Sequence, residues 1–307
     1  MTDGPAGGHV AAGLPAVSEW ARETGRLLRD RSGQVAAAGL AILVLPSILL
    51  TVSLWNALAD VRVEDTEVSG WDSSNVLPLA VTSLVYVFAW LLFVQACTRQ
   101  LLAAGVGRAE VWGDSVGAGL ATLPRLLAYG LLAALGVALA WVIGVGIAVA
   151  VPVLLVVVVP AAIGAILWLA VKLFFVVAAA SGAARGTNIL TASATISRGR
   201  FWPVAGRVLL VFAIGWVAVF ALNILTVPVT SRGDWESDVE IGDDGTIRDL
   251  VFADLFPNTG FLAVMVVMGT LVQGVQAAIV TAGTVLLYRD GGGDASLVTR
   301  PPSAAAS

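Results

Sequence analysis

Residues 126–171 read LLAYGLLAALGVALAWVIGVGIAVAVPVLLVVVVPAAIGAILWLAV and carry no charged side chain over 46 consecutive positions. Arg125 precedes this stretch and Lys172 follows it, and the apolar character continues to about Ala180. A helix rises about 1.5 Å per residue, and the hydrocarbon core of a bilayer is about 30 Å thick. The stretch is therefore too long for a single transmembrane helix.

A break is expected near the middle of this stretch. Gly144, Gly146 and Pro152 are the strong helix breakers in that region. Two helices, over residues 126–149 and 154–180, joined by a tight turn, account for the whole stretch.

Four further runs of the chain contain no charge and are long enough to cross a bilayer. They cover residues 35–55, 77–97, 208–229 and 260–288. The sequence therefore predicts an all-α integral membrane protein with six transmembrane helices within residues 14–290. Residues 1–13 and 291–307 are rich in Gly, Ala, Ser and Pro, and we expect them to be disordered tails.

The composition agrees with lipid as the solvent. Hydrophobic residues make up 58% of the 307 residues and charged residues only 12%, whereas a soluble domain has about 25% charged residues. The mean hydropathy is +0.91. These proportions exclude a soluble globular enzyme.

Residues suited to catalysis are scarce. One histidine, His9, and one cysteine, Cys97, leave too few ligands for a His/Cys metal site. Neither a G-x-x-x-x-G-K-[ST] phosphate loop nor a G-x-S-x-G nucleophile elbow is present. We expect no enzyme activity and no cofactor.

The arginines predict the orientation in the membrane, because cytoplasmic loops retain positive charge. With six crossings, one side carries only Arg62, Arg232 and Arg248. The other side carries both termini and thirteen arginines, which are Arg22, Arg26, Arg29, Arg31, Arg99, Arg108, Arg125, Arg185, Arg198, Arg200, Arg207, Arg289 and Arg300. The prediction is a multi-pass protein of the cell membrane with both termini in the cytoplasm.

Three segments on the arginine-rich side, residues 14–31, 108–123 and 188–200, show helical spacing of apolar residues with polar residues between them. This pattern is typical of helices that lie in the membrane interface. The segments predict three helical hairpins, each preceded by a short cytoplasmic interfacial helix. The alternative is that these loops collect arginine through the charge bias and leucine through the composition.

Residues 192–202 read ASATISRGRFW and are followed by a glycine and a long apolar helix, and residues 287–290 read LYRD. These motifs resemble the membrane domain associated with bacterial glycerophosphodiester phosphodiesterases, and the likeness covers about residues 14–290. That family is named for a catalytic domain that this sequence lacks. The resemblance therefore implies a membrane module of unassigned role, not phosphodiesterase activity.

The leading functional hypothesis is a non-catalytic membrane scaffold or accessory module. Its basic cytoplasmic helices would contact anionic lipid or a partner protein, with a second copy of the chain as one such partner. The residues expected to make the contact are Arg198, Arg200, Phe201, Trp202 and Arg207, because guanidinium groups bind phosphate oxygens and aromatic rings suit headgroup depth. The alternative is that they act only as topology signals. No continuous basic face is present, so we expect no nucleic-acid partner.

Five polar residues within the predicted spans support a rival hypothesis, a small-molecule or lipid transporter with an intramembrane polar cavity. They are Lys172, Gln95, Asn223, Gln273 and Gln276. Lys172 could instead extend to the headgroups or pack against Gln95 and Gln276. Asn223 and Gln273 could also hold neighbouring helices together through hydrogen bonds.

The predicted outer loop at residues 230–258 is the most acidic part of the chain. Its carboxylates are Asp234, Glu236, Asp238, Glu240, Asp243, Asp244, Asp249 and Asp254. The segments Val239-Glu240-Ile241 and Thr246-Ile247-Arg248, in which apolar and polar residues alternate, flank the sequence GDDG, which favours a solvated β-hairpin. A calcium site is the alternative, although the spacing does not fit an EF-hand.

Overall fold

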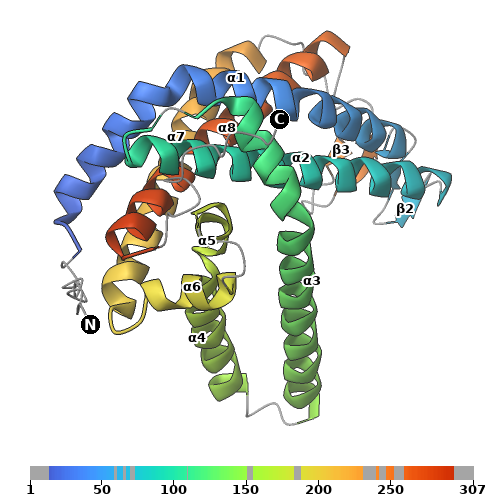
Figure 1. The fold of residues 1–307 in the computed structure, drawn as a ribbon. Coiled ribbons are helices and arrows are strands. Elements are labelled where there is room, and N and C mark those ends of the chain that lie inside the picture. Colours follow the sequence, from blue (N-terminus) through green and yellow to red (C-terminus); the bar gives the residue numbers. More distant parts are fainter. Residues whose placement is uncertain are drawn as a thin grey trace, which may run out of the picture. The chain divides into compact units, whose positions relative to one another are not determined.

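The computed structural model describes residues 14–58, 61–64, 67–69, 73–108, 110–150, 155–182, 188–230, 240–241, 247–251 and 259–293 (Figure 1). Its helices are α1 (Val17–Leu58), α2 (Val76–Gly105), α3 (Trp112–Ala150), α4 (Leu155–Leu173), α5 (Val176–Gly182), α6 (Ile189–Ile196), α7 (Phe201–Thr230) and α8 (Thr259–Asp290). A short 3-10 helix, Ser73–Asn75, precedes α2. The strands are β1 (Arg62–Glu64), β2 (Glu67–Ser69), β3 (Glu240–Ile241) and β4 (Ile247–Val251).

Six helical segments are long and apolar enough to cross a membrane. They are Val17–Leu58, Val76–Gly105, Trp112–Leu132, Gly164–Gly182, Phe201–Leu222 and Val266–Asp290. Each overlaps one of the six spans predicted from the sequence. The prediction of an all-α protein with six transmembrane helices is confirmed, with a small sheet added in the connecting segments.

The chain falls into two compact units. The first contains Met1–Arg31, Val94–Ala213 and Ile279–Ser307, and the second contains Ser32–Phe93 and Ile214–Ala278. The boundaries between them lie within α1, α2, α7 and α8.

The end predicted for the first helix of the long apolar stretch, at residue 149, lies within one residue of the end of α3. Helix α3 continues through Gly144 and Gly146 to Ala150, and residues 151–154 lie outside the described part. In lipid a broken helix would expose backbone groups without water to bind them, so glycine alone does not end the helix.

Only one of the three expected interfacial helices is a separate short helix, α6. Residues 17–31 are the start of the 42-residue helix α1, and residues 112–123 are the start of α3. Helix α1 continues through Gly33 and α3 continues through Pro124, so each amphipathic segment runs into its span without a break. The interfacial position of these segments and the hairpin arrangement stay predictions.

The fourth predicted span is not one continuous helix. Helix α4 ends at Leu173, residues 174–175 form a turn, and α5 begins at Val176. The hydroxyl of Ser193 in α6 donates to the Lys172 carbonyl over 2.6 Å, so a carbonyl at the break has a partner. The break also places Phe175 in the core with no exposed surface. The sequence shows neither Gly nor Pro there, so no breaker signals this turn.

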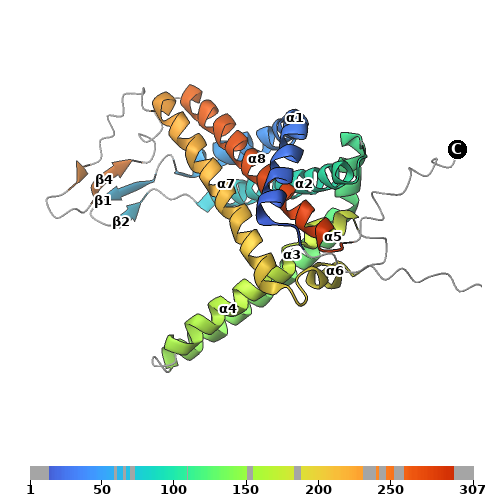
Figure 2. The ribbon, with the colours of Figure 1, turned by 90° about the vertical axis from the view of Figure 1, so that its left-hand side faces the viewer.

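The second unit contains a four-stranded antiparallel sheet in the order β2-β1-β4-β3. Figure 2 shows β1, β2 and β4 next to one another. The pairing of β3 with β4 confirms the predicted hairpin around residues 242–245. The pairing of Val63 in β1 with Leu250 in β4 was not predicted, because it joins two segments far apart in the sequence.

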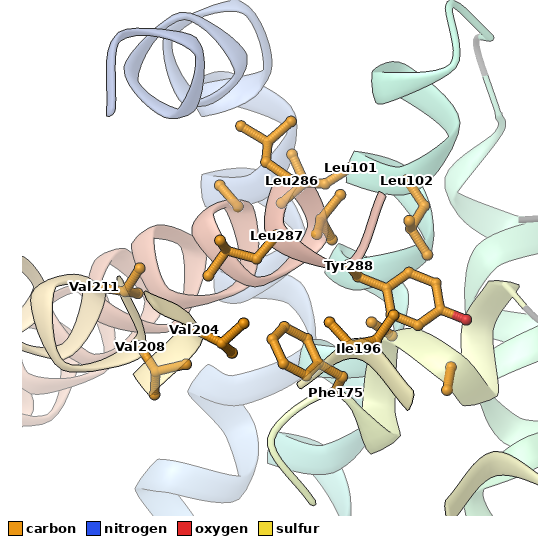
Figure 3. Packing of buried hydrophobic residues seen from close by; sticks show 14 of the residues in the cluster. Leu101, Leu102, Phe175, Ile196, Val204, Val208, Val211, Leu286, Leu287 and Tyr288 are labelled. Carbon is orange, nitrogen blue, oxygen red and sulfur yellow. The ribbon is translucent and has the colours of Figure 1, made fainter. Parts of the chain in front are cut away.

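The core of the first unit surrounds the last two turns of α8. All eight residues from Thr281 to Tyr288 are buried. In Figure 3, Phe175 and Ile196 gather with Leu286, Leu287 and Tyr288. The cluster also receives Trp20 from α1, Leu101 and Leu102 from α2, and Val204, Val208 and Val211 from α7.

Residues 291–293, predicted as the start of a disordered tail, instead form the turn that ends α8. Residues 1–13 and 294–307 lie outside the described part.

Candidate functional site

A tight turn between α6 and α7 presents two of the predicted contact residues. Asn188 caps the start of α6 by accepting hydrogen bonds from the backbone N–H groups of Leu190 and Thr191, at 3.0 and 3.3 Å. After α6, Gly199 takes a φ of 71°, a conformation that favours glycine. This turn leaves Arg198 exposed, and it leaves Trp202 76% exposed.

Phe201 and Arg200 fix the same turn to the core. Phe201 packs against the hydrophobic cluster and makes an edge-to-face contact with Trp202, at 5.3 Å between ring centroids. Arg200 is half-buried and donates from Nη2 to the Gly291 carbonyl over 3.4 Å. We call residues 197–202 the arginine turn, because Arg198 and Arg200 flank its glycine.

Arg207, the fifth predicted contact residue, does not belong to this exposed group. Its side chain points into the first unit, where the residue is only 8% exposed. Its Nη2 donates to the carbonyl of Pro15, just before α1. The expectation of a surface contact is therefore corrected for Arg207, because positions 204, 205, 207, 208 and 211 form the buried face of α7.

Arg289 joins three elements near the arginine turn. Its guanidinium lies 2.9 Å from Glu23 of α1 and 2.9 Å from the neighbouring Asp290, and it donates to the Gly105 carbonyl at the end of α2 over 3.4 Å. Sequence reasoning counted Arg289 only as a topology signal. The glycines that follow it are the feature that could have indicated a packed turn.

The ends of α2 and α8 share one geometry. The Gly293 N–H donates to the Tyr288 carbonyl and the Gly292 N–H donates to the Arg289 carbonyl, with a φ of 84° at Gly292. The N–H groups of Arg108 and Gly107 make the equivalent bonds to Ala103 and Ala104, with a φ of 77° at Gly107. Both ends are Schellman motifs, in which a left-handed glycine ends the helix and supplies donors to its last carbonyls.

A second ion pair lies in the same unit and was not predicted. Arg99 Nε donates to Glu110 Oε1 over 2.5 Å. Gln100 lies beside it in sequence and donates to the Glu110 carbonyl at 2.8 Å and to the Ser115 hydroxyl at 3.1 Å. These contacts fix the connection between α2 and α3.

Gln95 makes hydrogen bonds within the first unit. It is 1% exposed, donates to the Thr122 hydroxyl over 2.9 Å and accepts from the Ser181 hydroxyl over 2.6 Å. The bonds connect α2, α3 and α5.

In the second unit, Tyr86 of α2 donates to the side-chain oxygen of Gln273 in α8. This bond agrees with the prediction that Gln273 holds helices together. Gln276 is half-buried, and the side chain of Asn223 lies outside the described residues.

The polar contacts of Lys172 within the first unit are made to α6 and to its own helix, and packing against Gln95 and Gln276 stays a prediction. Its Nζ donates to the Ala194 carbonyl in α6 over 3.3 Å and lies 5.8 Å from the centroid of the Trp168 ring. Together with the bond from Ser193 to the Lys172 carbonyl, this contact holds α6 against the end of α4.

The described residues hold no group of three or more His, Cys, Asp or Glu side chains that could bind a metal ion. Most of the acidic outer loop lies outside them, as do the side chains of Glu240 and Asp249. The calcium alternative for residues 230–258 is therefore not addressed by the structure.

No protein-family model matches the chain, and no curated protein or solved structure gives a match. The resemblance at residues 192–202 and 287–290 stays a prediction. The six apolar helices define the chain as a multi-pass helical membrane protein.

Proposed function

We propose that this protein is a non-catalytic membrane module of the cell membrane that binds anionic lipid headgroups through the arginine turn. Both termini and the turn would lie on the cytoplasmic side. The observation that carries the proposal is the exposure of Arg198 and Trp202 on a turn whose other side chains are anchored to the core.

The two exposed side chains suit the two chemical layers of a membrane surface. Trp202 is the most exposed of the large hydrophobic residues in the described part of the chain, and indole rings prefer the headgroup level. Arg198 stands four residues away and offers a planar set of donors to a phosphate. At the membrane surface the Trp202 ring would lie at the headgroup level, and the donors of Arg198 would bind a lipid phosphate.

The fixed backbone of the arginine turn lowers the entropy cost of binding a lipid headgroup. A mobile loop loses conformational freedom when it binds, whereas this turn already has its backbone fixed. Gly199, the Phe201 ring and the bond from Arg200 to the Gly291 carbonyl fix it. A partner protein or a second copy remains an outcome of the test below.

The described residues do not favour the transport alternative. The polar groups of Gln95 are hydrogen bonded to Thr122 and Ser181, and Gln273 is bonded to Tyr86. Lys172 contacts a backbone carbonyl and a tryptophan ring. These contacts support roles in holding helices together.

The test is native mass spectrometry of the full chain, purified in mild detergent and offered equal amounts of phosphatidylglycerol and phosphatidylcholine. We expect the wild type to retain phosphatidylglycerol preferentially. Arg198→Gln should lower that preference about fivefold, since one basic side chain near a lipid surface contributes about 1 kcal/mol.

Arg26→Gln is the matched control, because it removes the same charge from an exposed site where Asp30 lies 4.0 Å away. The lipid preference of this variant should stay close to that of the wild type. Equal losses in the two variants would show a general charge effect and contradict the assignment to the arginine turn. A retained protein subunit in place of lipid would favour a protein partner.

A further inference from the structure

Arg207 is a buried charge without a counter-ion among the described residues. It is 8% exposed, and no carboxylate of that part of the chain lies within salt-bridge distance of it. Its Nη2 donates to the neutral carbonyl of Pro15, and its Nε–H has no acceptor there. By contrast, Arg99 and Arg289 each face at least one carboxylate.

Such an arrangement is costly without a further partner. Burying a charge costs several kcal/mol unless an opposite charge and hydrogen bonds compensate for it. An N–H group left without an acceptor adds its own desolvation cost. The surroundings of Arg207 therefore favour an anion with at least one oxygen near Nε.

A second buried donor without an acceptor among the described residues, the indole N–H of Trp20, lies on α1 and packs beside Val211 of α7. Trp20 is 1% exposed, and its indole N–H has no partner in the described part of the chain. A Cβ placed on Gly283 would lie 3.2 Å from Trp20 Cζ2 and 2.5 Å from Val211 Cγ2, so Trp20 and Val211 meet at this glycine. Val211 is one helical turn from Arg207 on the same face of α7, and Cζ2 lies on the indole edge that carries the N–H.

The two donors belong to elements already in contact, since Pro15 and Trp20 lie on either side of the start of α1 and Arg207 lies on α7. We infer that Arg207 and Trp20 bind a single phosphate oxyanion between the start of α1 and α7. Arg207 directly precedes the predicted span over residues 208–229, so it would lie at the edge of the bilayer core, next to the layer that contains the lipid phosphates.

The source of the phosphate is either a lipid headgroup or a free phosphate ion. The lipid source rests on the proposed function, in which this end of the molecule faces anionic headgroups. The free-ion source does not depend on it.

The test measures thermal unfolding of the full chain in nanodiscs of phosphatidylcholine. One arm adds sodium phosphate, with sodium chloride at equal ionic strength as its reference. The other arm replaces part of the lipid with phosphatidic acid in phosphate-free buffer. We expect at least one arm to raise the unfolding midpoint of the wild type by about 2–4 °C, and the arm that does so identifies the source.

Arg207→Lys keeps the charge but loses the planar donor set, and it should lose this increase. Trp20→Phe keeps an aromatic ring but loses the N–H, and it should reduce the increase. Arg26→Gln should keep it in full, because it removes the same charge from an exposed position outside both this site and the arginine turn. An unchanged midpoint in both arms for the wild type, or a full increase in Arg207→Lys, would overturn the inference.

Discussion

Gln95 shows how a fully polar side chain is accommodated among apolar helices. Its amide nitrogen donates to Thr122 and its amide oxygen accepts from Ser181. The Thr122 hydroxyl in turn donates to the Ala118 carbonyl one turn earlier, at 3.1 Å. Every polar atom in this chain of contacts has a partner, which is the condition for burying them in a medium without water.

Replacing Gln95 by leucine should destabilise the first unit. The variant Gln95→Leu loses two interhelical hydrogen bonds, which in membrane proteins contribute about 0.6 kcal/mol each on average. We expect a loss of about 1–2 kcal/mol, measured as the free energy of unfolding in mixed detergent micelles. Gln276→Leu is the control, because Gln276 has no hydrogen-bond partner in the described part of the chain, and it should change that free energy little. Equal losses would mean that the hydrogen bonds of Gln95 do not matter.

For single residues, the sequence indicates which polar side chains stand within the apolar spans, but not which residues they contact. Gln95, Gln273 and Lys172 stand out because polar groups are rare in the spans. Their partners do not stand out, because Ser181 and Thr122 can always satisfy their hydroxyls through their own helix backbone. Arg207 was likewise assigned to the surface because charge predicts exposure, and only the packed face of α7 shows that it is buried.

Among the six candidate spans of the described residues, the one in α8 has the largest buried share. The residues around Gly283 are buried, and a Cβ at this position would meet Val211 at 2.5 Å and Trp20 at 3.2 Å. The glycine therefore allows α7 and the start of α1 to approach α8 closely, as small residues do in membrane helices.

Gly283→Ala should weaken this packing by about 1–3 kcal/mol, the usual cost of an added methyl group in a filled core. Gly206→Ala on α7 is the matched control, since nothing lies within 4 Å of its added Cβ. That control should be neutral or more stable by about 0.5–1 kcal/mol, because alanine favours the helix. Thermal unfolding followed by tryptophan fluorescence in detergent would measure both. A larger loss for Gly206→Ala than for Gly283→Ala would contradict the packing.

The elements themselves were largely predictable, because a hydrocarbon core forces each long uncharged run to be helical. The exceptions have local causes that composition does not record. Helix α1 continues through residues 32–34 although Gly33 lies there, and α3 continues through Pro124. The turn at residues 174–175 depends on the bond from Ser193 and on the burial of Phe175, and both come from distant parts of the chain.

At the scale of the whole chain, the small sheet constrains the topology. Strand β1 follows the first transmembrane helix and β4 precedes the last one, and the two strands are paired in register. Both must therefore lie on the same side of the membrane, so the chain between them crosses an even number of times. The six-span order requires this arrangement, and the pairing supports it independently of the arginines.

The pairing of β1 with β4 can be tested by a disulfide between Val63→Cys and Leu250→Cys. These residues are Cα partners in the antiparallel ladder, where facing Cα atoms lie about 4.5–5.5 Å apart and a disulfide can form. We expect the double variant to cross-link in intact cells, because the predicted location of the sheet is outside the cytoplasm, where disulfides persist. Non-reducing electrophoresis after cleavage between residues 63 and 250 would show the two fragments still joined. The native Cys97 is buried and does not compete.

The control pairs Val63→Cys with Thr2→Cys, a position that is predicted to be cytoplasmic, and this pair should not cross-link. Cross-linking of that control would place the N-terminus beside the sheet and contradict the six-span topology.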